Sequence, residues 1–409
     1  MCKSVHHVWM NLSCLKDNPQ LQFLSVSAVC WLISFGFALM PLDTYEAESF
    51  LLSAVFMGFA FIAGIIVAPV AQIRNLLKSP VFAGVVAFWV LALVSVLASE
   101  VREISFLYFV FFSALPLSFV LFSVHSFNGF LIKIAVWGAA FVLCALAVFA
   151  VVSYYALPEF LFYGQVHWPL ANPNSFAGLM SFGFWGALGL CVYAKEKIHL
   201  GLAVGHALLF FAAMLMTGSV GALLAVVLVF PLFVVVSWRY LSGKKYVLIG
   251  VFVGCLVLGA LFSMPVAQIQ SHANESGVSV EVLSSRPAIW QSAIEIAQGH
   301  PWTGTGIGTF FLYYPEVRDA EDASTAGLMV HNDPLQFTSE MGVLAPLVFY
   351  GLAIFILIKM YKAMVTNVFD RGRKVVVFTS FCALLAMLLH THRSEERRVG
   401  KECRSRWWP

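Results

Sequence analysis

The stretch HNDPLQFTSEMG, which begins at His331, places a histidine and an Asn-Asp-Pro turn directly before an apolar run. Histidine titrates near neutral pH, so His331 has the chemistry to take a proton from a hydroxyl group. Asn332 or Asp333 can cap a helix that starts at Pro334, and a helix N-terminus favours phosphate. The alternative is that Asn-Asp-Pro is only a cap and that His331 is a surface residue.

Glu340 belongs to the same stretch and lies six residues into the expected helix. At ~1.5 Å per residue it would lie about 9 Å deeper than the helix start. A carboxylate at such a depth needs a cation or a proton. We expect this helix to continue without a break into the apolar run that ends near Lys359.

Arg286 opens a second segment of interest, SSRPAIWQSAIEIAQGHP. This segment carries helix start and stop signals: serines that can cap its first turn, a proline within that turn, and Gly-His-Pro at its end. Arg286, Trp290 and Ala293 share one stripe by their i, i+4, i+7 spacing. The run GTGIG that follows lacks the Lys-Ser/Thr of a nucleotide loop and predicts a tight turn.

Three further polar residues have plain structural explanations. Arg318 stands beside Asp319 and Glu321, which predicts an ordinary solvated ion pair. Asn172 and Asn174 belong to WPLANPNSFAG, where turn signals lead into an apolar run. We expect them to cap a helix, and either could also contact a polar ligand.

The composition indicates a membrane protein. Of the 409 residues, 60% are hydrophobic and 11% are charged, whereas soluble chains carry roughly 25% charged residues. Such a chain must use lipid as its solvent. The net charge of +3 is too small to indicate nucleic acid, and the eight cysteines avoid the long polar segment, which excludes a disulfide framework.

A membrane-spanning helix needs about 20 mostly apolar residues. His199 and His206 are the clearest ionisable residues within the apolar runs. We expect each to bond a neighbouring group rather than form a metal or proton relay, because no carboxylate accompanies them. The sequence predicts about eleven spans, at 21–42, 49–73, 80–99, 104–122, 133–157, 173–194, 198–217, 219–238, 246–266, 341–359 and 375–391.

The basic residues orient these spans, because cytoplasmic loops carry the excess of Lys and Arg. With the N-terminus inside, only Arg102, Arg286 and Arg318 lie outside up to residue 392. The one long polar segment then lies outside and holds the proposed active site. The expected regions are N-terminal helices in 1–172, core helices in 173–266, the outer loop in 267–340, C-terminal helices in 341–392 and a tail in 393–409.

Four motifs together resemble the O-antigen ligase and polymerase superfamily. HNDPLQFTSEMG is similar to its His-Asn pair followed by Glu and Gly, and SSRPAIWQSAIEIAQGHPWTGTGIGTF to its Arg-to-Trp helix and Gly-rich turn. ANPNSFAGL resembles the Asn-Pro-Asn start of a middle span, and LMTGSVGALLA the short outer turn between two spans. The motifs fall in order across about residues 171–345, and the N-terminal spans match only by hydropathy.

The resemblance implies an all-α polytopic membrane protein, GT-C-like, whose long periplasmic loop contains short helices. It implies a metal-independent glycosyltransferase of the bacterial inner membrane, without cofactors and with a cytoplasmic N-terminus. The enzyme would move a glycan from undecaprenyl diphosphate to an acceptor hydroxyl on the periplasmic side. The implied catalytic residues are His331 and Glu340, and the implied substrate-binding residues are Arg286, Arg318, Asn332, Asn172 and Asn174.

The acceptor stays open at this point. It would be lipid A-core, a second lipid-linked glycan, or a protein hydroxyl, as in a protein O-oligosaccharyltransferase. A non-enzymatic flippase or transporter, with the outer loop as a gate, is the rival class, and the shortage of charges in the spans argues against it. An inactive homologue is the third alternative, and no alternative involves nucleic acid.

The chain departs from the family pattern at two places. Many members carry Arg, thought to hold the diphosphate of the donor, where this chain has Val220, which would shift that task to Arg286 or Arg318. The tail RSEERRVGKECRSRWWP is densely charged and resembles a peptide that recurs, through assembly error, at the end of unrelated predicted proteins. We expect the native chain to continue instead with at least one further helix, to about twelve.

The orientation predicts which loops an impermeant thiol reagent can reach. In a cysteine-free background, single cysteines at Ser279 and Ala323 should react in intact spheroplasts, because the long loop lies outside. A cysteine at Ser242 should react only after lysis. Labelling of Ser279 and Ala323 only after lysis would reverse the orientation.

Overall fold

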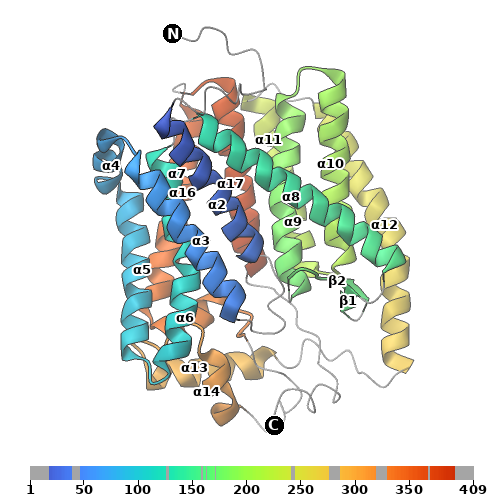
Figure 1. The fold of residues 1–409 in the computed structure, drawn as a ribbon. Coiled ribbons are helices and arrows are strands. Elements are labelled where there is room, and N and C mark those ends of the chain that lie inside the picture. The colour runs from blue at the N-terminus through green and yellow to red at the C-terminus, as the bar shows by residue number, and fades with distance from the viewer. Residues whose placement is uncertain are drawn as a thin grey trace. The chain divides into compact units, whose positions relative to one another are not determined.

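The computed structural model describes residues 18–38, 47–125, 129–157, 160–162, 164–170, 172–240, 245–275, 286–318, 329–366 and 369–391 (Figure 1). The helices are α2 (Pro19–Ala38), α3 (Ala47–Ile66), α4 (Val70–Leu77), α5 (Pro80–Ala98), α6 (Arg102–Phe112), α7 (Ala114–Val124), α8 (Gly129–Ala156), α9 (Pro173–Tyr193), α10 (Lys197–Met216), α11 (Val220–Tyr240), α12 (Lys245–Glu275), α13 (Arg286–Gly299), α14 (Phe310–Val317), α15 (Asp333–Met341), α16 (Leu344–Val365) and α17 (Arg371–Thr391). One short antiparallel hairpin joins β1 (Leu161–Phe162) to β2 (Gln165–Val166).

The described residues contain ten helical segments long and apolar enough to cross a membrane. The protein is therefore an all-α multi-pass membrane protein, as the composition predicts. The predicted span at 246–266 corresponds to α12, in which the apolar part Tyr246–Phe262 is shorter than the other ten. The predicted tail lies outside the described residues.

Two predicted spans are interrupted. The predicted end of the span 49–73 is wrong, because α3 stops at Ile66 and α4 begins only after Pro69. Proline has no backbone N–H and so cannot continue the hydrogen bonds of a helix. The predicted span 104–122 consists of α6 and α7, separated at Ser113. The hydroxyl of Ser113 donates to the Phe109 carbonyl at 2.7 Å, a back-bond that bends helices.

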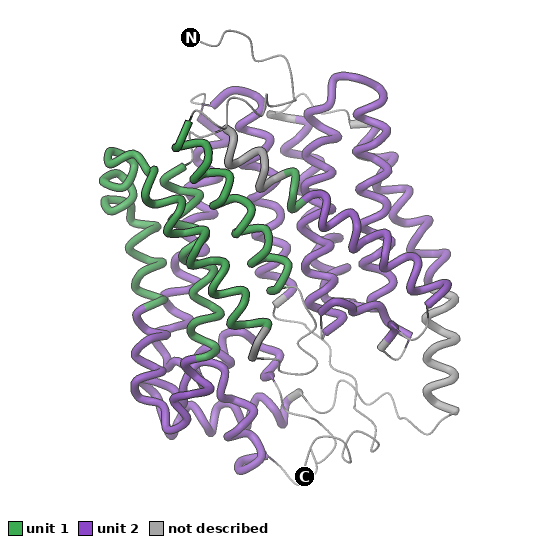
Figure 2. Tube along the Cα trace, in the orientation of Figure 1, with its two compact units in different colours: residues 1–40, 46–89, 107–139 green, residues 41–45, 90–106, 140–409 purple. Residues whose placement is uncertain are grey.

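The chain forms two compact units (Figure 2). Unit 1 comprises residues 1–40, 46–89 and 107–139, and its centre is the pair α2–α3. The Ser27 hydroxyl of α2 donates to the Ala60 carbonyl of α3 at 2.7 Å. Because lipid supplies no hydrophobic drive between helices, small residues and such hydroxyl bonds hold the pair together.

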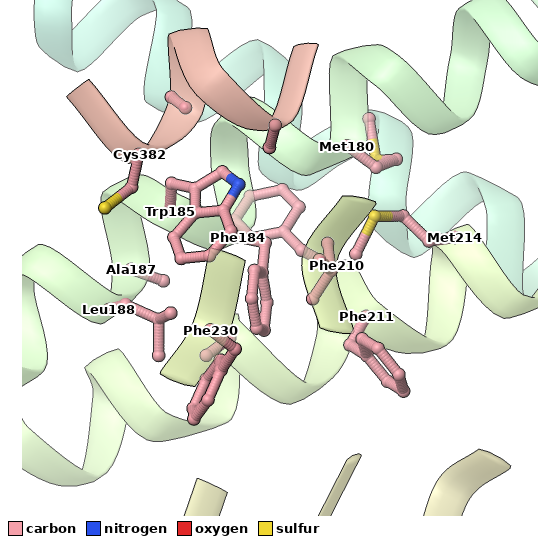
Figure 3. Packing of buried hydrophobic residues seen from close by; sticks show 14 of the residues in the cluster. Met180, Phe184, Trp185, Ala187, Leu188, Phe210, Phe211, Met214, Phe230 and Cys382 are labelled. Atoms are coloured by element: carbon pink, nitrogen blue, oxygen red, sulfur yellow. The ribbon is translucent and has the colours of Figure 1, made fainter. Parts of the chain in front are cut away.

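Unit 2 comprises residues 41–45, 90–106 and 140–409, and its core lies among α9, α10, α11 and α17. Helix α9 is the most buried span, and Phe184 and Trp185 on it are fully buried. Trp185 packs against Phe233 of α11, which stacks on Phe378 of α17 at 5.0 Å between ring centroids. Figure 3 shows Phe184, Trp185, Phe230 and Cys382 gathered in this core.

Glycines let neighbouring helices approach α9 closely. A Cβ atom at Gly183 would lie 2.6 Å from the Phe210 ring of α10. A Cβ atom at Gly189 would lie 2.4 Å from the Thr379 hydroxyl of α17. The absence of a side chain at these two positions therefore sets the helix packing of unit 2.

This packing makes a testable difference between two glycines of the same helix. Gly189→Leu should lower the thermal unfolding midpoint in detergent, because overpacking typically costs about 1–3 kcal/mol. Gly186→Leu is the matched control, since nothing lies within 4 Å of its added Cβ and the residue is exposed. Equal midpoints for the two variants would show that α9 and α17 are not closely packed.

Candidate functional site

The candidate site is built on α13, α14 and α15 of unit 2. Helix α13 begins at Arg286 and ends at Gly299, as the start and stop signals predict. Its buried residues Ile289, Ala293 and Ile296 form an apolar cluster with Phe310 and Tyr314 of α14 and Val330 before α15. This small core holds the three short helices together.

The glycine-rich turn between α13 and α14 packs backbone to backbone against the end of α15. The Thr305 N–H donates to the Ser339 carbonyl at 3.0 Å, and the Gly306 N–H to the Glu340 carbonyl at 2.9 Å. A Cβ atom at Gly304, whose φ is +64°, would lie 2.1 Å from the Glu340 carbonyl carbon. The prediction of a tight turn is confirmed, and the structure adds that α15 is its partner.

Glu340 closes this contact with its side chain. Its carboxylate accepts the Gly308 N–H at 2.9 Å, the Phe310 N–H at 3.1 Å and the Gln336 side-chain amide at 2.7 Å. Phe310 is the first residue of α14 and Gly308 lies two residues before it, so Glu340, from another helix, satisfies one free amide of α14 and one amide of the preceding turn. Burial raises the pKa of Glu340 to about 7, and the hydrogen bonds from Gly308, Phe310 and Gln336 lower it in part.

His331 forms the corner that leads into α15. It has a φ of +57°, a left-handed conformation that is uncommon outside glycine. It is 6% exposed, which excludes the alternative of a surface histidine. Asn332 caps α15 as predicted, because its side chain accepts the Leu335 N–H at 3.3 Å. A backbone held in such a conformation is a feature of functional sites.

The expected continuous helix from Pro334 to Lys359 is wrong. Helix α15 ends at Met341, and α16 begins at Leu344. Between them Gly342 has a φ of +83°, and its Cβ would lie 2.2 Å from the Trp302 carbonyl oxygen. The Val343 N–H donates instead to the Pro301 carbonyl at 2.9 Å. The backbone of Pro301 and Trp302, just before the glycine-rich turn, therefore lies against Gly342 and Val343 at the break between α15 and α16.

The two predicted arginines lie at the beginning of α13 and at the end of α14. Arg286 is the first residue of α13, and its side chain lies outside the described part of the structure. Arg318 caps the C-terminus of α14 with its backbone N–H on Tyr314, and its expected partners Asp319 and Glu321 lie outside the described residues. Trp290 shares the Arg286 stripe, and its buried indole N–H has no acceptor within the described chain.

Asn172 and Asn174 lie on a different set of helices, at the start of α9. The Asn172 side chain accepts the Asn174 N–H at 2.7 Å, which confirms the predicted cap. The Asn174 carbonyl lies 3.0 Å from Nε2 of His390 on α17. The β1–β2 hairpin packs on α9, and Figure 1 shows it apart from α13 and α14.

Val220, which stands where many family members carry Arg, is the first residue of α11 and is 48% exposed. The turn before it is closed by Gly218, with a φ of +66°, and by the Thr217 hydroxyl, which accepts the Ser219 N–H. Because Val220 is half-exposed, a longer side chain at this position would extend into the surroundings of the helix.

The histidines within the spans differ from each other. His206 lies 2.7 Å from the Leu202 carbonyl of its own helix, as expected. His199 lies 3.4 Å from the Glu196 carboxylate, which corrects the expectation that no carboxylate accompanies it. Both members of that pair are exposed. The described residues hold no group of three or more His, Cys, Asp or Glu that could bind a metal.

The raised pKa of Glu340 makes stability depend on pH. Because burial raises the pKa of Glu340 from its ordinary value of 4.5 to about 7, the folded state keeps this proton up to about pH 7. The folded state therefore binds more protons between these values, and this carboxyl makes stability fall as pH rises from about 4.5 to about 7. Thermal unfolding midpoints are measured for the wild type and for Glu340→Gln. The advantage of the wild type over the variant should become smaller as pH rises through that window. A constant difference would show that Glu340 is not protonated in the fold.

Comparison with known proteins identifies the segment that contains this site. Residues 206–350 match a family model described as O-Antigen ligase. No curated protein and no solved structure matches the chain. The matched segment includes α13, α14 and α15, whereas Asn172 and Asn174 precede it. Residues 206–350 of this membrane protein, which contain α13, α14 and α15, are therefore similar to the O-antigen ligase family.

Proposed function

We propose that the chain is a glycosyltransferase that moves a glycan from undecaprenyl diphosphate to an acceptor hydroxyl. The reaction would take place on the periplasmic side of the bacterial inner membrane. The observation that carries this proposal is the buried His331 in a left-handed corner, fixed by α15 within the family domain. The predicted orientation, which puts this region outside, supports the periplasmic side.

His331 is the proposed general base. The acceptor hydroxyl must lose a proton as it attacks the anomeric carbon, and histidine is suited to that task near neutral pH. Backbone strain at a single residue persists only where its surroundings hold it. Here the Asn332 cap follows directly and the buried Val330 precedes it, so both neighbours fix the corner.

Arg286 is the proposed ligand of the leaving diphosphate. Displacement of a diphosphate needs cations or N–H dipoles near its oxygens. The start of α15 is a poorer candidate than its position in the sequence implies, because Asn332 already accepts the Leu335 N–H and Asp333 adds a negative charge. Helix α13 packs against α15, and the open indole N–H of Trp290 lies one turn after Arg286. Arg318 and Asn332 would assist binding less directly.

Glu340 is proposed as a positioning residue. Its hydrogen-bond donors are Gly308 and Phe310 at the turn and Gln336 on its own helix, so the carboxyl group is directed into the packing between α14 and α15. Its role would be to hold α14 and the glycine-rich turn against α15. Asn172 and Asn174, which cap α9, remain candidates for contact with a distant part of the substrate.

The direct test is a transfer assay with purified protein. The donor is an undecaprenyl-diphosphate glycan, and the three acceptors are lipid A-core, a second lipid-linked glycan and a pilin-type protein. Transfer to one acceptor identifies a ligase, a polymerase or a protein O-oligosaccharyltransferase. Movement of the donor across a proteoliposome membrane without transfer to any acceptor would favour a flippase.

The roles of His331 and Arg286 make separable predictions. His331→Ala should lower turnover by roughly a hundredfold or more and keep donor affinity, because general base catalysis typically contributes 10²–10⁴. Arg286→Ala should mainly weaken donor affinity, and Arg286→Lys should restore it only in part, since Lys lacks the planar fork. Donor affinity and turnover are measured for each variant.

The control for this experiment is His199→Ala, which removes an exposed histidine on α10 and should change neither quantity. Loss of donor affinity in His331→Ala as large as in Arg286→Ala would contradict the assignment. His331 would then be a phosphate ligand, and the base would have to be sought elsewhere.

A further inference from the structure

Three buried serines at the end of α5 and the start of α6 lie against the glycine-rich turn. Ser95, Ser99 and Ser105 are at most 2% exposed and belong to unit 2. All three precede residues 206–350 and so lie outside the matched family domain. A run of buried hydroxyls beside a bent backbone segment is a way to satisfy N–H groups that water cannot reach.

Ser95 makes a direct bond to the turn. Its hydroxyl oxygen accepts the Ile307 N–H at 3.2 Å and donates its own proton to the Ala92 carbonyl at 2.7 Å. Both hydrogen-bonding partners of Ser95 are thus backbone groups. A buried N–H without an acceptor costs about 1–3 kcal/mol, so the bond is expensive to lose.

Ser99 and Ser105 lie against the residue that precedes Ile307 in the turn, Gly306. Gly306 has a φ of +117°, and an added Cβ atom would lie 2.5 Å from the Ser99 hydroxyl and 2.8 Å from that of Ser105. The turn backbone therefore approaches this corner as closely as a glycine allows. Such an approach fixes the position of the turn as well as its conformation.

Adjacent amides of the turn point to two different partners. The Ile307 N–H bonds to Ser95 on α5, and the Gly308 N–H bonds to Glu340 on α15. The Gly306 N–H also bonds to the Glu340 carbonyl. Residues 306–308 thus join α5 to the helix that carries His331 at its start.

We propose that Ser95 is a positioning residue for the reaction of the family domain. By accepting the Ile307 N–H, it holds residues 306–308 in the conformation that presents amides to Glu340, and so fixes α15 and the His331 corner. This role rests on the proposed function of His331. It gives a membrane helix outside the family domain a direct part in organising the site.

The experiment compares Ser95→Ala with Ser95→Thr, which keeps the hydroxyl. The matched control is Ser27→Ala, which removes a buried hydroxyl bonded to a neighbouring helix in unit 1. Amide hydrogen exchange of the 304–310 peptide is measured by mass spectrometry. Turnover and KM for the lipid-diphosphate donor are measured on the same preparations. Should Ser95→Ala give no folded protein, Ser95→Cys replaces it, because sulfur is a weak acceptor.

Ser95→Ala should raise exchange at 304–310 about tenfold and lower turnover about tenfold with KM unchanged, the loss expected for one buried bond of about 1.4 kcal/mol. Ser95→Thr and Ser27→Ala should match the wild type in both. Unchanged exchange in Ser95→Ala would overturn the contact, and raised exchange with normal turnover would overturn the positioning role. A wild type that transfers no glycan would refute the proposed function, and the exchange result would still decide the Ser95–Ile307 contact.

Discussion

The site depends on the buried Glu340 carboxylate and the three N–H donors around it. A carboxylate that is 5% exposed is costly unless hydrogen bonds replace its water. Here the replacements are the Gly308 and Phe310 amides and the Gln336 side chain. The Phe310 amide is at the start of α14 and the Gly308 amide belongs to the turn before it, so the Glu340 side chain satisfies both backbone groups while they replace its water. The arrangement of α15, and with it His331, follows from that contact.

The sequence predicts much of this architecture because the signals are local. The spans follow from apolar runs of sufficient length, α13 from its serine, proline and glycine signals, and the Asn332 cap from Asn-Asp-Pro. The partners of Glu340 could not be predicted in the same way, because backbone amides carry no side-chain signature. The break at Gly342 was missed for a similar reason: it is set by the Trp302 carbonyl, which approaches from another segment. In the sequence, Ser95 is one small residue in an apolar span far upstream, and nothing in that span predicts its contact with Ile307.

The polar residues that the family resemblance assigns to the site fall into two sets in the structure. His331, Asn332, Glu340 and the start of α13 belong to one group of packed short helices. Asn172 and Asn174 belong to the start of α9, beside β2 and His390 of α17. Val220 is exposed at the start of α11, where many members of the resembling family carry Arg, so the proposed function assigns the diphosphate to Arg286.

The most direct test is an experimental structure of the protein with an undecaprenyl-diphosphate donor bound. We expect diphosphate oxygens within about 3 Å of the Arg286 guanidinium, the usual length of a charge-assisted hydrogen bond. We also expect the anomeric carbon of the donor to face His331, and the Glu340 carboxyl group to keep its hydrogen bonds from the Gly308 and Phe310 amides. A diphosphate bound at the α10–α11 turn beside Val220, with His331 remote from the sugar, would contradict it.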